Sequence, residues 1–87
     1  PRTHFFPKNP QPVFTAYTAS RERMLTEMTN GIDVMLHEDI RWHRCDIKSL
    51  NLLPNTLAFE KAVRKGCQEA ILHRRDIVTE ASSSNVF

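Results

Sequence analysis

The chain has 87 residues, which is enough for one small domain at most. It contains 12 Lys and Arg, 10 Asp and Glu and 4 His, and its formal net charge of +2 is too small to predict a nucleic-acid partner. The sequence has no apolar run of about 18 residues, so we expect no membrane-spanning helix. Two cysteines cannot form a disulfide framework, and they favour a reducing compartment, the cytoplasm.

The first half of the chain predicts short elements. Residues 1–12 hold four of the five prolines and predict extended, irregular backbone. Residues 13–18 are β-branched and aromatic, which is typical of a strand. Residues 20–30 have apolar side chains at rough helical spacing and predict a short helical turn. Residues 32–38 alternate apolar and polar side chains and predict a second strand.

The clearest predicted element is a helix over about residues 50–65. Ser49 or Asn51 can cap its N-terminus, and Pro54 falls in the first turn, where a missing N–H is tolerated. Gly66 supplies the stop. The large apolar side chains fall on two opposite sides, which predicts burial between two layers. These two groups are Leu50, Leu53 and Leu57, and Leu52, Phe59 and Val63.

The last part of the chain predicts a hairpin over residues 69–79. An apolar run at 70–72 and a short apolar segment at 77–79 flank the polar turn at 74–76. The predicted fold class is therefore α/β, of the α+β kind, with short strands around one central helix.

The two ends of the chain suggest a piece of a larger protein. The sequence begins at Pro1 and not at Met, and it ends on Val86 and Phe87 without a polar tail. A helix that is apolar on both sides also needs more cover than so short a chain can provide. We expect the sequence to be an internal fragment.

The spacing of the reactive and charged side chains does not by itself predict a metal, nucleic-acid or catalytic site. The His and Cys residues lack the paired spacing of zinc ligands, so we expect no metal. Cations and Trp42 interleave over residues 41–48, but Asp39 and Asp46 accompany them, which favours a solvated surface over a nucleic-acid groove. Ser82 to Ser84 lack a nucleophile-elbow pattern. Lys48 by itself is typical of a surface lysine.

Similarity to a known family is more informative than the spacing of individual residues. The segment 38–53 (EDIRWHRCDIKSLNLL) closely resembles the D-amino-acid aminotransferases, also called D-alanine transaminases, in the class IV aminotransferase family. These are pyridoxal 5'-phosphate (PLP) enzymes of the branched-chain-aminotransferase fold type. The similarity continues through 65–74 and 78–87 and includes 1–4, whereas 20–31 is the least similar part.

The resemblance implies roles for individual residues. Lys48 matches the catalytic lysine that forms a Schiff base with PLP and moves the substrate proton. Glu80 matches the carboxylate that pairs with the pyridine nitrogen. Arg2 and His4 match the Arg-x-His pair that binds the substrate carboxylate, the feature that favours the D-amino-acid branch. The loop 82–85 lies beside the cofactor in the family.

One departure from the family concerns Ala81, which stands where close relatives often have glycine. An alanine at this position is compatible only with a negative φ, or with strain that is offset elsewhere.

The resemblance also implies an organisation and a reaction. Residues 1–20 would end the small domain and interdomain segment, and 21–87 would form the incomplete N-terminal part of the large PLP-binding domain. The full enzyme would be a homodimer that converts D-alanine and 2-oxoglutarate to pyruvate and D-glutamate. The isolated fragment would be inactive, because the family's phosphate-binding residues lie outside it. A branched-chain aminotransferase, an aminodeoxychorismate lyase and a non-catalytic interaction fragment remain alternatives.

Overall fold

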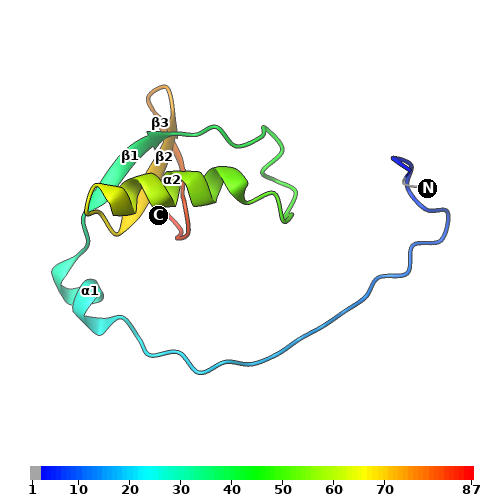
Figure 1. The fold of residues 1–87 in the computed structure, drawn as a ribbon, viewed down its shortest axis with the longest axis horizontal. Helices are drawn as coiled ribbons and strands as arrows, with labels where there is room; N and C mark the ends of the chain where they lie inside the picture. Colours follow the sequence, from blue (N-terminus) through cyan, green and yellow to red (C-terminus); the bar gives the residue numbers. More distant parts are fainter. Residues whose placement is uncertain (1–2) are drawn as a thin grey trace.

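A computed structural model describes residues 3–87 as an extended N-terminal segment followed by a small mixed body of helix and sheet (Figure 1). The body contains one three-stranded sheet in the order β1-β2-β3 and one main helix, α2. This arrangement confirms the predicted fold class. The elements are α1 (Leu25–Asn30), β1 (Val34–Glu38), α2 (Leu53–Arg64), β2 (Glu69–Arg74) and β3 (Ile77–Ala81).

The sheet combines one parallel and one antiparallel pair. β1 and β2 run parallel, with Val34 opposite Glu69, and the chain between them contains α2, as a parallel connection requires. β2 and β3 form the predicted hairpin, and Arg75 in its turn has a φ of 53°. The register of the hairpin shifts between Leu72 and His73, because Leu72 lies opposite Glu80 but His73 lies opposite Val78.

Helix α2 confirms part of the sequence prediction. Pro54 lies in its first turn, and Gly66, with a φ of 79°, follows its end. The predicted capping is wrong, because the N-cap position is Leu52 and no side chain caps the helix. The Ser49 hydroxyl instead accepts a hydrogen bond from the Asn51 backbone N–H at 3.3 Å, one turn before the helix.

The helix packs on the sheet through alanines. Ala58 and Ala62 of α2 are buried against Ala70 and Leu72 of β2. The predicted burial of both bulky sides is wrong within this chain, since Leu53 is 67% exposed. The alanine stripe lies between the two bulky groups on the helix surface, and its small side chains allow a close approach to the sheet. Among residues 3–87, no helix is long and apolar enough to cross a membrane.

The N-terminal half follows the predictions only in part. The helical turn and the strand after it are confirmed as α1 and β1, and the side of β1 that packs inward carries Met35. The predicted strand at 13–18 is wrong: this segment is exposed coil, with Phe14 90% exposed. β-Propensity reflects packing and pairing on a sheet, and no strand of the described residues lies beside this segment.

Candidate active site

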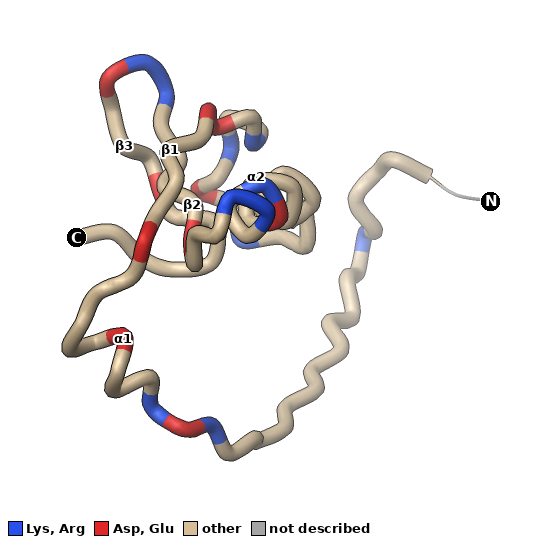
Figure 2. Tube along the Cα trace, turned by 60° about the vertical axis from the view of Figure 1, so that its left-hand side comes forward, with Lys and Arg blue, Asp and Glu red and all other residues tan. Residues whose placement is uncertain are grey.

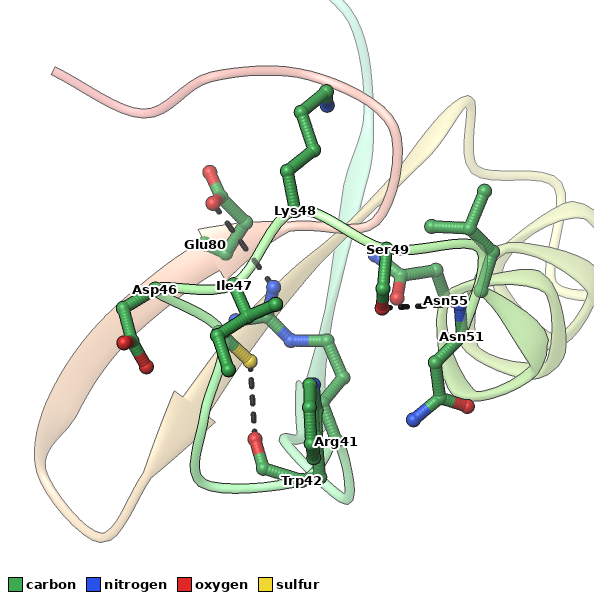
Figure 3. Close-up of a pocket in the computed structure, with 11 residues that line it drawn as sticks. Arg41, Trp42, Asp46, Ile47, Lys48, Ser49, Asn51, Asn55 and Glu80 are labelled. Atoms are coloured by element: carbon green, nitrogen blue, oxygen red, sulfur yellow. Dashed lines mark hydrogen bonds and ion pairs between the residues drawn. The ribbon is translucent and has the colours of Figure 1, made fainter. Parts of the chain in front are cut away.

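Lys48 and Glu80 line the same pocket, although 32 residues separate them in the sequence. Lys48 comes from the loop between β1 and α2, and Glu80 from the end of β3 (Figure 3). The pocket has a volume of about 260 Å³ and is open to solvent. The other lining residues are Arg41, Trp42, Cys45, Asp46, Ile47, Ser49, Asn51, Leu52 and Asn55.

An arginine accompanies the Glu80 carboxylate. Nη1 of Arg41 lies 4.0 Å from Oε2 of Glu80, and Figure 3 shows this contact at the side of the pocket. The Arg41 side chain is only 12% exposed, whereas the Glu80 side chain is 41% exposed. The hydrogen bonds found among residues 3–87 include none from Nζ of Lys48. The pocket therefore presents the Lys48 amine and the Glu80 carboxylate from different elements, together with the Arg41 guanidinium and the Asp46 carboxylate.

Asp39, just after β1, holds Arg41 in place. Its carboxylate accepts hydrogen bonds from Nε and Nη2 of Arg41 at 2.9 and 3.1 Å and from Oγ1 of Thr79 at 2.8 Å. Nη2 of Arg74 lies 3.2 Å from the same carboxylate. Burial acts to raise the pKa of Asp39, but the hydrogen bonds from Arg41 and Thr79 outweigh it and lower the pKa to about 2. The network fixes the arginine beside Glu80.

The remaining charges of the 41–48 segment do not form a basic surface. Arg44 pairs with Asp46 at 2.8 Å, and both side chains are exposed. Positive and negative residues alternate over the body of the protein in Figure 2. The structure thus gives no support to a nucleic-acid groove at this segment. No group of three His, Cys, Asp or Glu side chains within residues 3–87 is placed to hold a metal ion.

A second cavity of about 510 Å³ extends the first along the loop that follows β3. Arg41, Lys48 and Glu80 line both cavities, and residues 81–85 line the second. Nδ2 of Asn55, on the first turns of α2, donates a hydrogen bond to the carbonyl of Ser82 at 3.0 Å. The loop is therefore tied to the helix that borders the pocket.

Ala81, which stands where relatives often have glycine, does not have a positive φ. Among the described residues, Arg75 is the only non-glycine residue with a positive φ, so the backbone of Ala81 is unstrained in this respect. The alanine is buried at the end of β3.

Of the predicted substrate-binding pair, the structure describes only His4. Arg2 lies outside the described residues. His4 is exposed, and residues 3–12 line neither cavity. The roles of Asp39, Arg41 and Asn55 could not be predicted from the sequence, since nothing in their spacing indicates that the fold brings them together. The Asp-x-Arg pattern of Asp39 and Arg41, within the family-like segment 38–53, was the one hint that these two residues interact.

Comparison with known families gives a match over nearly the whole chain. Residues 3–87 match the family described as amino-transferase class IV. The chain belongs to this family, which confirms the resemblance found in the sequence.

Three relatives narrow the comparison further, and each is named D-alanine aminotransferase. The protein of Staphylococcus epidermidis RP62A is 56% identical over all of this chain, and that of Staphylococcus aureus N315 is 52% identical over 99% of it. The protein of Bacillus licheniformis is 45% identical over all of the chain. The chain spans 31% of the length of each of these relatives.

Proposed function

We propose that this chain carries the reacting lysine and the ring-nitrogen carboxylate of a PLP-dependent D-amino-acid aminotransferase. One observation carries the proposal: Lys48 and Glu80, from separate elements, line one pocket. The names of the relatives support the choice of a D-amino acid, with D-alanine as the amino donor.

The residues of the pocket fit the cofactor. Lys48 offers a primary amine, which can hold an aldehyde covalently and, once released, can take a proton from the substrate Cα. Glu80 offers a carboxylate that can accept a hydrogen bond from a protonated ring nitrogen. PLP, when bound, supplies an electron-withdrawing ring for the electron pair left at Cα. Nη1 of Arg41 lies 4.0 Å from the Glu80 carboxylate and favours its charged form.

Lys48 would act as the proton carrier of the reaction. Its free amine would take the proton from Cα of the D-amino acid and hold it for return to the reacting group. The reverse sequence uses a second 2-oxo acid. In balance, D-alanine and 2-oxoglutarate give pyruvate and D-glutamate, with the amino group transferred and no net redox change.

Arg2 and His4 complete the proposal as the substrate-carboxylate pair. A guanidinium binds a carboxylate through two parallel hydrogen bonds, and a fixed carboxylate decides which face of Cα meets Lys48. The resemblance of residues 1–4 to the family supports this role. We further propose the homodimer and the two-domain division at residues 20–21 on the same resemblance, and a cytoplasmic location on the two free cysteines.

The lysine is tested with the complete protein that carries this chain. Addition of PLP to the purified apoprotein should produce a yellow species, and borohydride reduction should leave a pyridoxyl group on Lys48, located by peptide mass spectrometry. The variant Lys48→Ala should show no covalent label, whereas Lys61→Ala, on the exposed surface of α2, should be labelled normally. A colourless wild-type protein without label would favour a non-catalytic interaction role.

The substrate assignment is tested through Arg2. Replacement by alanine should lower kcat/KM for D-alanine about 100-fold, mostly through KM, because a charged bidentate contact is lost. Arg21→Ala, at an exposed position outside the motif, serves as the control. Unchanged D-alanine turnover in Arg2→Ala, or a preference for branched-chain L-amino acids or aminodeoxychorismate, would point to the other branches of the family.

A further inference from the structure

Glu69 is a buried carboxylate that the proposed reaction does not use. It lies at the start of β2, is 3% exposed, and lines neither of the two cavities. A buried charge is costly unless hydrogen bonds compensate for its lost hydration. The structure supplies that compensation almost entirely from one short loop.

The loop donates three consecutive serine hydroxyls to Glu69. Oγ of Ser82 donates to Oε1, and Oγ of Ser83 and Oγ of Ser84 donate to Oε2 at 2.7 and 2.6 Å. The backbone N–H groups of Ala70 and Ser83 complete the set at 2.8 and 3.3 Å. Burial acts to raise the pKa of Glu69, but the serine hydrogen bonds outweigh it and lower the pKa to about 2.

The same loop forms a wall of the larger cavity. Because its hydroxyls donate to Glu69, the loop is held from the sheet side, while Asn55 holds the carbonyl of Ser82 from the helix side at 3.0 Å. Glu80 precedes Ser82 by only two residues along β3. A displacement of the loop would therefore move the end of the strand that presents Glu80.

We propose that Glu69 is a positioning residue, which fixes the loop 82–84 and thereby sets the place of the Glu80 carboxylate in the pocket. The inference deepens the proposed function and rests on it for the cofactor. The position demands a carboxylate, because only an acceptor without N–H groups can receive all five donors. A glutamine there would leave one backbone N–H, that of Ser83 or that of Ala70, facing another donor, whichever way its amide is turned.

The test compares three variants of the complete protein. Glu69→Gln removes the charge with almost no change of shape. The double variant Ser83→Ala, Ser84→Ala keeps Glu69 but removes two of its hydrogen-bond donors. It tests the same proposal if Glu69→Gln does not fold. Glu60→Gln is the matched control, since Glu60 is exposed on α2 and pairs with Arg64. Each apoprotein is titrated with PLP, and the absorption spectrum of the bound cofactor is followed against pH.

The proposal expects Glu69→Gln and the double serine variant to raise the Kd for PLP about tenfold, as loss of an outer hydrogen-bond partner does at metal sites. Both should also alter the pH dependence of the cofactor spectrum, which a loss of stability alone would not change. Glu60→Gln should match the wild type. A wild-type Kd and spectrum in Glu69→Gln would overturn the proposal, as would a wild-type result for the double variant.

Hydrogen exchange separates this inference from the proposed function. The apoprotein of Glu69→Gln should exchange its amides at residues 82–84 at least tenfold faster than the wild type, with or without PLP chemistry at Lys48. If the wild type takes no PLP but the loop still loosens, only the proposed function fails. If PLP binds at Lys48 and the loop exchange does not change, only the role of Glu69 fails.

Discussion

Asp39 shows what a single buried side chain does for the candidate site. Its side chain is fully buried, and it contacts two arginines and a threonine from three parts of the chain. A buried ion pair adds little net stability compared with apolar packing, but loss of one partner leaves an uncompensated charge. The effect of Asp39 is therefore best seen when it is removed.

The variant Asp39→Asn should destabilise the complete protein by about 3 kcal/mol, because Arg41 and Arg74 would keep their charges without a carboxylate. Asp46→Asn is the matched control: it breaks an exposed pair with Arg44 and should cost less than about 0.5 kcal/mol. Urea unfolding monitored by circular dichroism measures both. Equal costs for the two variants would contradict the importance of burial at Asp39.

The two lowered carboxyl pKa values predict a loss of stability in acid. In the folded protein Asp39 and Glu69 each have a pKa of about 2, below the usual values of 3.8 and 4.5. The stabilisation is fully present above the unfolded pKa values and is lost as the pH falls from about 5 to 2. At about 1.4 kcal/mol for each pKa unit, Asp39 contributes about 2–3 kcal/mol and Glu69 about 3–4 kcal/mol. Urea unfolding of the complete protein at pH 5 and pH 3 should show this decrease.

The same measurement on Asp39→Asn and Glu69→Gln tests the assignment of that acid sensitivity. Each variant should lose part of the difference between pH 5 and pH 3, whereas Asp46→Asn should retain nearly all of it. An unchanged pH dependence in both of the first two variants would place the acid-sensitive groups elsewhere.

At the scale of elements, the contact between α2 and β2 depends on small side chains. Ala62 is completely buried in this contact. The variant Ala62→Leu should therefore destabilise the complete protein by about 1–3 kcal/mol, because overpacking pushes the helix away from the sheet. Ala16→Leu, at an exposed coil position, should be nearly neutral. Thermal unfolding distinguishes the two, and a neutral Ala62→Leu would mean that the interface is looser than described.

The elements could be predicted from the sequence where local chemistry determines them. The proline and glycine that bracket α2 are local signals that the structure confirms. The alternation over 32–38 predicted the strand correctly, but the apolar Val34 and Leu36 lie on its exposed side and Met35 packs inward. The inward face of α2 was missed because bulky apolar residues dominate a periodicity argument, whereas the sheet contacts the alanines between them. The strand at 13–18 was wrong because a strand requires a neighbour, which a local pattern cannot provide.

At the scale of the whole molecule, the hydrophobic core of this chain is very small. Among residues 3–87, the buried apolar residues are Ala58, Ala62, Ala70, Leu72 and Ala81, and Leu72 is the only one larger than alanine. Burial of so little apolar surface cannot offset the conformational entropy of 87 residues. The stability of this segment must come from contacts outside it.

The isolated 87-residue polypeptide should therefore unfold without a cooperative thermal transition and should take up no PLP. In the complete protein, by contrast, the amides of β2 should be among the best protected against hydrogen exchange, since β2 is the central strand. Differential scanning calorimetry tests the first expectation. A sharp transition with a heat-capacity increase near 1 kcal/mol/K would contradict it.

The candidate site could be predicted only in its outline. Similarity to the family pointed to Lys48 and Glu80, and the fold brings both to one pocket. The polar supports around them, Asp39 and Glu69, depend on pairings across 40 and 13 residues of sequence, to Thr79 and Ser82. Such distant pairings follow from strand register, which spacing along one sequence does not reveal.

Because the register shifts in the β2–β3 hairpin, the number of residues in β3 determines the side of the sheet to which Glu80 points. Thr79 is the extra residue opposite Leu72 and His73, and side chains alternate between the two sheet surfaces from there in each direction. A substitution in β3 changes one contact, and deletion of Thr79 would remove the bulge and leave Glu80 opposite Leu72. Insertion of one residue between Thr79 and Glu80 without a second bulge would turn this carboxylate to the opposite surface. Related proteins that keep this pocket should therefore tolerate many sequences in the hairpin but few insertions between its turn and Glu80.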